Sequence, residues 1–269
     1  MTQLALARPG GAEIRASILG EGWPVLAFNG ATLPLEFWDP LVDETDHALR
    51  WLRFDARNVG GTRAPGAFTL EDIAADGLTL LDRAGVETAI VVGHAWGGRA
   101  AQVLVRDHPE RVRGLVLLGS GGRHPPSVDA KAQYLLRRAR RDGLRDAWEA
   151  ALADLYCGPG FRTESPEAFA RLADLLWATP GRSAAHWDAA ASPIDEWWGR
   201  STVPTLLLYG SADRFGTREN AEDLHAAIAG SRLRTLDGAG HFLPRERVRE
   251  LALELVAFAQ HLAEEEMAP

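Results

Sequence analysis

The sequence predicts an α/β fold in which a mainly parallel sheet of eight strands carries helices on both faces. Two observations lead to this prediction. Short runs rich in Val, Leu and Ile alternate with longer stretches of helical periodicity along the 269 residues, a pattern typical of parallel strands joined by crossover helices. The alternation breaks once, between about residues 123 and 199, where helical spacing continues without a convincing strand. We therefore expect a core formed by residues 1–122 and 200–269, with 123–199 inserted as a helical lid.

The strands begin with an antiparallel hairpin and continue as single strands between helices. The hairpin segments flank a Pro-Gly-Gly turn, a sequence suited to a tight reversal of the chain. The later segments are apolar and bounded by turn residues, so we expect them to be buried on both faces of the sheet. The expected strands are 4–7 and 13–18 in the hairpin, then 24–28, 50–54, 88–92, 112–118, 203–209 and 232–236.

The helices are predicted from apolar residues at helical spacing. Pro109 and Gly230 fall where two of them should stop. Five of the nine tryptophans lie in the lid, where they either form the lid's own core or line an apolar substrate cavity. The expected helices are 70–84, 96–107, 217–229 and 244–263 in the core, and 130–141, 144–155, 166–177 and 183–190 in the lid.

Composition narrows the function classes. The net charge of −8 comes from 37 acidic and 29 basic residues spread along the chain, and we identify no basic block that could neutralise nucleic-acid phosphates. The single cysteine, Cys157, excludes an intrachain disulfide, and no stretch approaches the roughly 18 apolar residues that span a bilayer. We expect a cytoplasmic protein that acts on a small-molecule substrate, with no nucleic acid and no membrane as partner. Whether the protein forms a homodimer stays open.

No motif predicts a cofactor or a metal. The histidines show no paired spacing typical of metal ligands. The glycine-rich segment at 119–122 leads into the expected lid instead of opening a strand–helix–strand unit, so it does not match a dinucleotide-binding loop. We therefore expect neither a cofactor nor a metal ion.

The segment GHAWGG at 93–98 lies between an expected strand and an expected helix. At such a junction the central residue is held in a strained backbone conformation, and flanking glycines let strand and helix approach closely. The segment resembles the G-x-S-x-G nucleophile elbow of the α/β-hydrolases, with Ala95 where that family carries serine. The resemblance implies an α/β-hydrolase fold in which Ala95 occupies the nucleophile position without the nucleophilic oxygen.

Other segments extend the resemblance over nearly the whole chain. Asn29 and Gly30 follow the strand at 24–28, where the family usually has His-Gly. The resemblance implies that the backbone N–H groups of Ala31 and Trp96 form the oxyanion hole, next to Gly30 as a substrate-contacting residue. His94, inside the elbow, is expected to pack behind it.

The segment DARNVGGT at 55–62 matches a family loop that braces the end of the sheet. We therefore expect structural roles for Asp55 and Arg57.

Two more turns supply an acid and a base. Asp213 lies after the strand at 203–209, and His241 lies in the turn after the strand at 232–236. The order nucleophile, acid, histidine is that of the family. The resemblance implies that His241 accepts the proton of the nucleophile, while Asp213 fixes the imidazole tautomer and stabilises its cation.

The lid and the chain length look most like the prolyl aminopeptidase and small-molecule esterase branch of the family. Trp197 and Trp198, at the expected lid hinge, are candidates for substrate contact. The aromatic lid favours a fairly apolar, bulky acyl or ring-containing substrate, and we favour an esterase over a peptidase.

Three explanations of Ala95 stay open. The first is a serine hydrolase of an ester, thioester, lactone or amide that acts through an acyl-enzyme and is disabled here by a Ser→Ala substitution. The second is a natural enzyme, such as a lyase or cyclase, that uses the His241–Asp213 pair as a general base without an acyl intermediate. The third is a non-catalytic ligand-binding protein. An aspartate at position 95, as in haloalkane dehalogenases and epoxide hydrolases, would fit the same surroundings, although the position of the acid favours serine.

Overall fold

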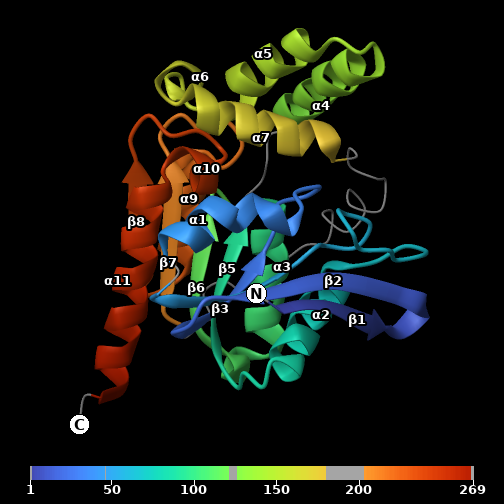
Figure 1. The fold of residues 1–269 in the computed structure, drawn as a ribbon. Helices are drawn as coiled ribbons and strands as arrows, with labels where there is room; N and C mark the ends of the chain where they lie inside the picture. The colour runs from blue at the N-terminus through green and yellow to red at the C-terminus, as the bar shows by residue number, and fades with distance from the viewer. Residues whose placement is uncertain (1, 46, 121–125, 180–202, 268–269) are drawn as a thin grey trace.

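In the computed structural model, described over residues 2–45, 47–120, 126–179 and 203–267, the chain forms one eight-stranded sheet (Figure 1). The strands are β1 (Thr2–Arg8), β2 (Ala12–Leu19), β3 (Trp23–Phe28), β4 (Leu49–Phe54), β5 (Ala89–His94), β6 (Val112–Leu118), β7 (Thr205–Gly210) and β8 (Arg232–Leu236). Their order in the sheet is β1-β2-β4-β3-β5-β6-β7-β8. β1 pairs with β2, and β2 with β4, in antiparallel fashion, whereas all later pairs are parallel. The fold class and the eight strands predicted from the sequence are confirmed.

The hairpin turn forms where the glycines predict it. Gly10 and Gly11 both adopt positive φ angles, 76° and 78°, a region that costs glycine little because it has no Cβ. The turn brings β2 into register with the whole length of β1, from Thr2 opposite Ile18 to Arg8 opposite Ala12.

Helices cover both faces of the sheet. In the core they are α1 (Asp39–Glu44), α2 (Leu70–Arg83), α3 (Trp96–Asp107), α9 (Arg218–Ala227), α10 (Leu243–Glu246) and α11 (Val248–Met267). Along β5, Ala89 and Val91 pack in the cluster with α2, α3 and α9, and Ile90 and Val92 pack in the cluster with α1, α10 and α11. This alternation follows from the period of two in a strand, and it explains why β5 is apolar on both faces.

One predicted helix is interrupted. The sequence predicts a single helix over 244–263, but the chain forms α10 and α11, separated by Arg247 with φ −132° and ψ 50°. The reason lies in the preceding residue: the Glu246 carboxylate is buried and accepts backbone N–H groups from outside the helix. These bonds fix the short α10 turn against its neighbours, and the long helix begins only after it.

Four helices lie across the carboxyl ends of the parallel strands (Figure 1). They are α4 (Pro126–Arg141), α5 (Arg145–Tyr156), α6 (Phe161–Glu164) and α7 (Pro166–Ala178), and we refer to them as the cap. Trp148 and Trp177 pack edge to face within it, with ring centroids 5.2 Å apart. Both boundaries of the expected lid and its expected last helix, 183–190, lie outside the described residues. The division into core and lid therefore stays a prediction.

Among the described residues, no helix combines the length and the apolar character that crossing a membrane would require.

Candidate active site

The elbow has a strained backbone at Ala95. Ala95 lies between β5 and α3 with φ 49° and ψ −118°, a conformation that is unfavourable for any residue with a Cβ. Its N–H donates to the carbonyl oxygen of Leu118 at 3.0 Å. Its carbonyl oxygen accepts the N–H of Gly98 at 3.0 Å and the hydroxyl of the buried Ser120 at 2.6 Å. Hydrogen bonds on both sides of the residue therefore hold the strained turn in place.

The elbow requires glycine at two positions because neighbouring backbone segments approach them closely. A Cβ at Gly93 would lie 2.4 Å from the Cα of Gly98, and a Cβ at Gly97 would lie 2.2 Å from the carbonyl oxygen of Asn29. Both distances are far below van der Waals contact. This tight junction between β5, α3 and the loop after β3 is what the glycine spacing predicts.

His241 and Asp213 form a buried pair. Nδ1 of His241 lies 2.9 Å from Oδ2 and 3.1 Å from Oδ1 of Asp213, and their side chains are 6% and 0% exposed. Oδ1 of Asp213 also accepts the backbone N–H groups of Phe215 and Gly216, at 2.8 and 3.0 Å. The carboxylate is thereby oriented toward the imidazole. A proton on Nδ1 satisfies it, which leaves Nε2 as the basic nitrogen of His241.

His94 also belongs to the site. Its Nε2 donates to the carbonyl oxygen of His241 at 2.8 Å, and its ring centroid lies 5.0 Å from those of both His241 and Phe37. It packs among rings, as expected, and in addition it lines the cavity described below. It therefore helps to position the loop that carries His241.

Glu246 is a further residue of the site, and the sequence analysis missed it. Its Oε2 accepts the backbone N–H groups of Gly158 at 2.7 Å and Gly240 at 2.9 Å, and its Oε1 accepts that of Phe242 at 3.0 Å. Burial raises the pKa of the Glu246 carboxyl, while the three N–H bonds act in the opposite direction. The carboxylate thus connects the two residues that flank His241 with the cap.

A second bond ties the same two segments together. The N–H of His241 donates to the carbonyl oxygen of Tyr156, the last residue of α5, at 2.6 Å. The Gly240 backbone is packed so closely that a Cβ there would lie 2.4 Å from the Gly158 nitrogen. Cap and histidine loop therefore form one hydrogen-bonded junction. No local sequence signal marks it, because the partners are distant in the chain.

Asn29 fixes the loop that follows β3. Its Nδ2 donates to the carbonyl oxygens of Leu33 at 2.8 Å and Phe54 at 3.2 Å, and its Oδ1 accepts the indole N–H of Trp38. This network holds the segment that carries Gly30 and Ala31. The amide of Asn29, which stands where the resemblance places a histidine, is thus hydrogen bonded through both its nitrogen and its oxygen.

The DARNVGGT loop shows the bracing contacts that its match to the family leads us to expect. Asp55 accepts the backbone N–H groups of Leu35 at 2.7 Å and Gly61 at 2.8 Å, although burial raises the pKa of its carboxyl. The Arg57 guanidinium donates two bonds to the buried carboxylate of Asp76, at 2.8 and 3.0 Å. Neither Asp55 nor Arg57 lines the cavity.

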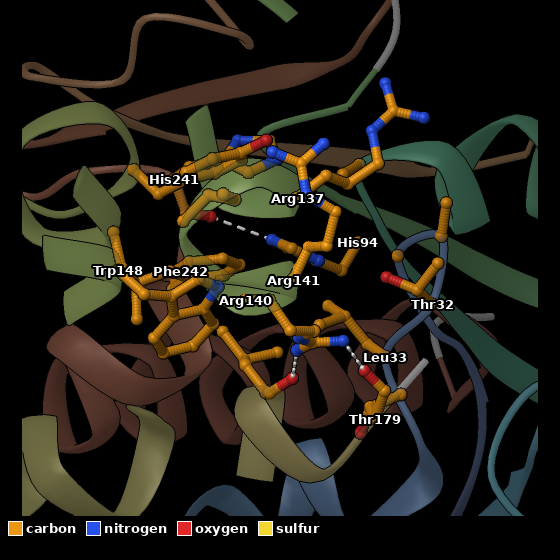
Figure 2. Close-up of a pocket in the computed structure, with 17 residues that line it drawn as sticks. Thr32, Leu33, His94, Arg137, Arg140, Arg141, Trp148, Thr179, His241 and Phe242 are labelled. Carbon is orange, nitrogen blue, oxygen red and sulfur yellow. Dashed lines mark hydrogen bonds between the residues drawn. The ribbon is translucent and has the colours of Figure 1, made fainter. Parts of the chain in front are cut away.

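A cavity of about 420 Å³ joins the core to the cap (Figure 2). On the core side it is lined by Gly30, Ala31, His94, Ala95 and His241, and on the cap side by residues of α4, α5 and α7. The structure therefore brings together most of the predicted site residues, with Asp213 hydrogen bonded to His241.

Three expected contact residues stand apart from this arrangement. Trp96 is buried at the first position of α3 and is not among the cavity's lining residues. Its N–H lies at a helix N-terminus, where backbone donors lack partners within the helix, so the oxyanion-hole assignment stays a prediction. Trp197 and Trp198 lie outside the described residues.

The cap side of the cavity corrects the expectation that the chain has no basic block. Four of the five residues at 137–141, at the end of α4, are arginines. Three of them line the cavity together with apolar side chains such as Trp148 and Leu152. Among the residues that the structure describes, no group of three or more His, Cys, Asp or Glu side chains could hold a metal ion.

Known proteins resemble this chain in family and fold. The family described as alpha/beta hydrolase fold matches residues 24–247 of the chain. A poly(3-hydroxyalkanoate) depolymerase of Ectopseudomonas oleovorans is 27% identical over 242 residues, which are 88% of this chain and 84% of the depolymerase. Two solved structures share the fold: a thermophilic esterase from Thermogutta terrifontis (TM-score 0.83, 23% identity, 97% of this chain and 99% of the esterase), and the enol-lactonase from Burkholderia xenovorans LB400 (TM-score 0.82, 24% identity, 96% and 100%).

Proposed function

Because the chain belongs to the α/β-hydrolase fold family, we propose that the cavity beside Ala95 is the acyl-binding site of an ester or lactone hydrolase that lacks only its nucleophilic oxygen. One observation carries the proposal. Ala95 retains the strained conformation of a nucleophile (φ 49°, ψ −118°) next to a cavity that His241 also lines. The esterase, the enol-lactonase and the depolymerase among the similar proteins support hydrolysis of an ester or lactone in general.

The strain supports reading Ala95 as a replacement of serine. A non-glycine residue in such a conformation costs on the order of 1–3 kcal/mol. This cost serves a nucleophile, because the turn presents the side chain to the substrate, but it serves an alanine in no evident way. Serine differs from alanine by a single oxygen, so the same backbone accommodates it. The chain as it stands should bind an acyl substrate with very little turnover.

With a serine hydroxyl at position 95, the reaction would follow from the positions of these groups. Nε2 of His241 accepts the hydroxyl proton while the oxygen attacks the substrate carbonyl carbon, and Asp213 stabilises the imidazolium. The N–H groups of Ala31 and Trp96 would stabilise the oxyanion. The imidazolium then returns the proton to the leaving alcohol. In the second half, water attacks the acyl-enzyme with His241 as base, and the carboxylic acid leaves.

The intact pair also supports a second candidate, a non-covalent reaction. The imidazole of His241 lines the cavity and keeps its bond to Asp213 although residue 95 carries only a methyl group. Such a pair can deprotonate water or an acidic C–H without any nucleophile at position 95.

Restoring the oxygen tests the proposal. The parent chain, Ala95→Ser and Ala95→Asp are compared on activated acyl esters, lactones, epoxides and haloalkanes, with His241→Ala in each background as control. We expect Ala95→Ser to raise ester or lactone turnover by about three powers of ten or more. Mass spectrometry should detect the acyl adduct, which the added His241→Ala substitution should abolish.

Other outcomes would replace the proposal. Gain of epoxide or haloalkane turnover only in Ala95→Asp would identify an aspartate nucleophile. Turnover by the parent chain that serine does not increase, but that His241→Ala removes, would identify the non-covalent reaction. Ligand binding with no turnover in any variant would identify a non-catalytic ligand-binding protein.

A further inference from the structure

The cap presents a positive face to the cavity. Arg137, Arg140 and Arg141 of α4 all line it (Figure 2). Their spacing of i, i+3 and i+4 places them on one side of the helix. Arg138, the remaining arginine of this run, is not a lining residue, and its Nε lies 3.8 Å from Oδ2 of Asp142. Three of the four arginines in this run therefore line the cavity, and Arg138 does not.

This positive face is not a consequence of composition. The chain has a net charge of −8, yet the described lining residues include three arginines and two histidines and no aspartate or glutamate. Arg145 of the cap, which is not a lining residue, pairs with Glu149 at 2.6 Å and with Asp174 at 2.8 Å. A cavity lined by one sign of charge concentrates ligands of the opposite sign.

The three lining arginines have different surroundings. Arg140 anchors α4 to α7: its Nη1 and Nη2 donate to the carbonyl oxygens of Thr179 and Leu176, at the end of α7. Its guanidinium also lies 5.7 Å from the Trp148 ring centroid and 5.6 Å from that of Trp177. Burial lowers the pKa of Arg140. It is a structural anchor, and it fixes the position of the helix that carries the other two.

Arg137 lies one turn before this anchor, and Arg141 directly follows it. The Arg141 side chain is 74% exposed, and its Nε pairs with Oδ1 of the adjacent Asp142 at 2.9 Å. Exposed pairs of this kind are weak because water and salt screen them. A ligand anion can therefore exchange with Asp142 at little cost, which suits the Arg141 guanidinium to ligand binding. Arg137 lines the same cavity.

We propose that the substrate carries an anionic group, in the simplest case a carboxylate, which Arg137 and Arg141 bind while the scissile ester or lactone lies at Ala95. A guanidinium matches a carboxylate through two parallel N–H···O bonds. Trp148, Leu152 and Phe242 supply apolar walls for the hydrocarbon part. The substrate class is thus a hemi-ester, or a lactone with a free carboxylate, instead of a wholly apolar ester. The inference rests on the proposed function, because it concerns the same cavity.

Ligand binding to the parent chain, which carries Ala95, tests whether the site prefers an anionic ligand. This measurement does not require turnover. The probes are monoethyl glutarate, an anion at pH 7, and diethyl glutarate, its neutral counterpart, followed by calorimetry. Arg137→Gln is compared with Arg138→Gln, which removes the same charge from the adjacent position outside the cavity. We expect the parent to prefer the anionic probe and Arg137→Gln to weaken its binding about tenfold. Arg138→Gln should change it less than twofold.

Two results would overturn the inference. Diethyl glutarate could bind the parent as tightly as the monoethyl ester, or the two substitutions could weaken the anion equally, which would reveal a diffuse surface charge. In the Ala95→Ser background, the ratio of kcat/KM for the monoester to that for the diester should fall about tenfold with Arg137→Gln. If Ala95→Ser is inactive while the parent still shows the Arg137-dependent binding, the hydrolase proposal fails and the anion site stands.

Discussion

The two sides of the cavity are built in different ways. On the core side, Ala95 and His241 lie in loops after the carboxyl ends of strands, and hydrogen bonds to the main chain fix both loops. On the cap side, the lining residues come from α4, α5 and α7, and side-chain contacts such as those of Arg140 set their positions. We infer that the core side carries the chemistry common to the fold, while the cap side selects the substrate.

The largest expected effect comes from damaging the core side. In the Ala95→Ser background, Asp213→Asn should lower kcat about 10³- to 10⁴-fold with little change in KM, because an amide no longer fixes the imidazole tautomer or stabilises its cation. Steady-state kinetics on an activated ester measures this. Asp237→Asn is the matched control, since Asp237 is exposed in the loop after β8, and it should stay within about twofold of its background.

This expectation would be wrong if the two substitutions had similar effects. In that case the bond of 2.9 Å between His241 and Asp213 would be structural. The His241–Asp213 pair on the core side would then have no special role in catalysis.

The core side could be predicted from the sequence because its signals are local. A strand followed by glycines at fixed spacing determines the turn at Ala95, and the turns that carry Asp213 and His241 follow strands in the same way. The sheet was predictable for a related reason: apolar runs such as β5 and β6 are buried on both faces. Each of these features depends on residues within a few positions of one another.

The cap side could not be predicted in the same way. Four arginines at 137–141 are visible in the sequence, but only the orientation of α4 decides which of them face the cavity. The contact of Glu246 with the cap likewise gave no signal, since Gly158 is 88 residues away. The bonds of the Glu246 carboxylate to Gly158, Gly240 and Phe242 also interrupt the predicted helix over 244–263. Specific side-chain contacts, and not helix propensity, determine these features.

A smaller effect is expected where the two sides meet. Glu246→Gln leaves one carbonyl oxygen to accept and turns an NH₂ group toward backbone N–H donors. We expect a loss of about 1–3 kcal/mol in the free energy of unfolding, and in the Ala95→Ser background a fall of roughly tenfold in kcat with KM nearly unchanged. Chemical denaturation and steady-state kinetics give the two values.

Glu250→Gln is the control for this position, because Glu250 lies on α11 with an exposed side chain and pairs only weakly with Arg247 at 3.5 Å. It should change neither quantity measurably. A loss of stability in Glu246→Gln with an unchanged kcat would mean that the junction supports the fold but does not position His241.

The smallest expected effect is a local opening of the same junction, which Cys157 can report. Cys157 is buried between Tyr156, which accepts the N–H of His241, and Gly158, which donates to Glu246. Burial raises the pKa of its thiol far above the ordinary range, so the folded chain should react with iodoacetamide very slowly at neutral pH. Because alkylation requires transient opening, Glu246→Gln should accelerate it by about threefold to tenfold, as measured by mass spectrometry over time.

The same rate should rise with pH in both proteins, since the thiolate is the reacting form, and Glu250→Gln should match the parent. Equal rates in the parent and in Glu246→Gln would show that the carboxylate does not hold the cap to the histidine loop. A faster rate together with a lower kcat would show that one buried carboxylate couples the substrate-selecting side of the cavity to the side that carries the base.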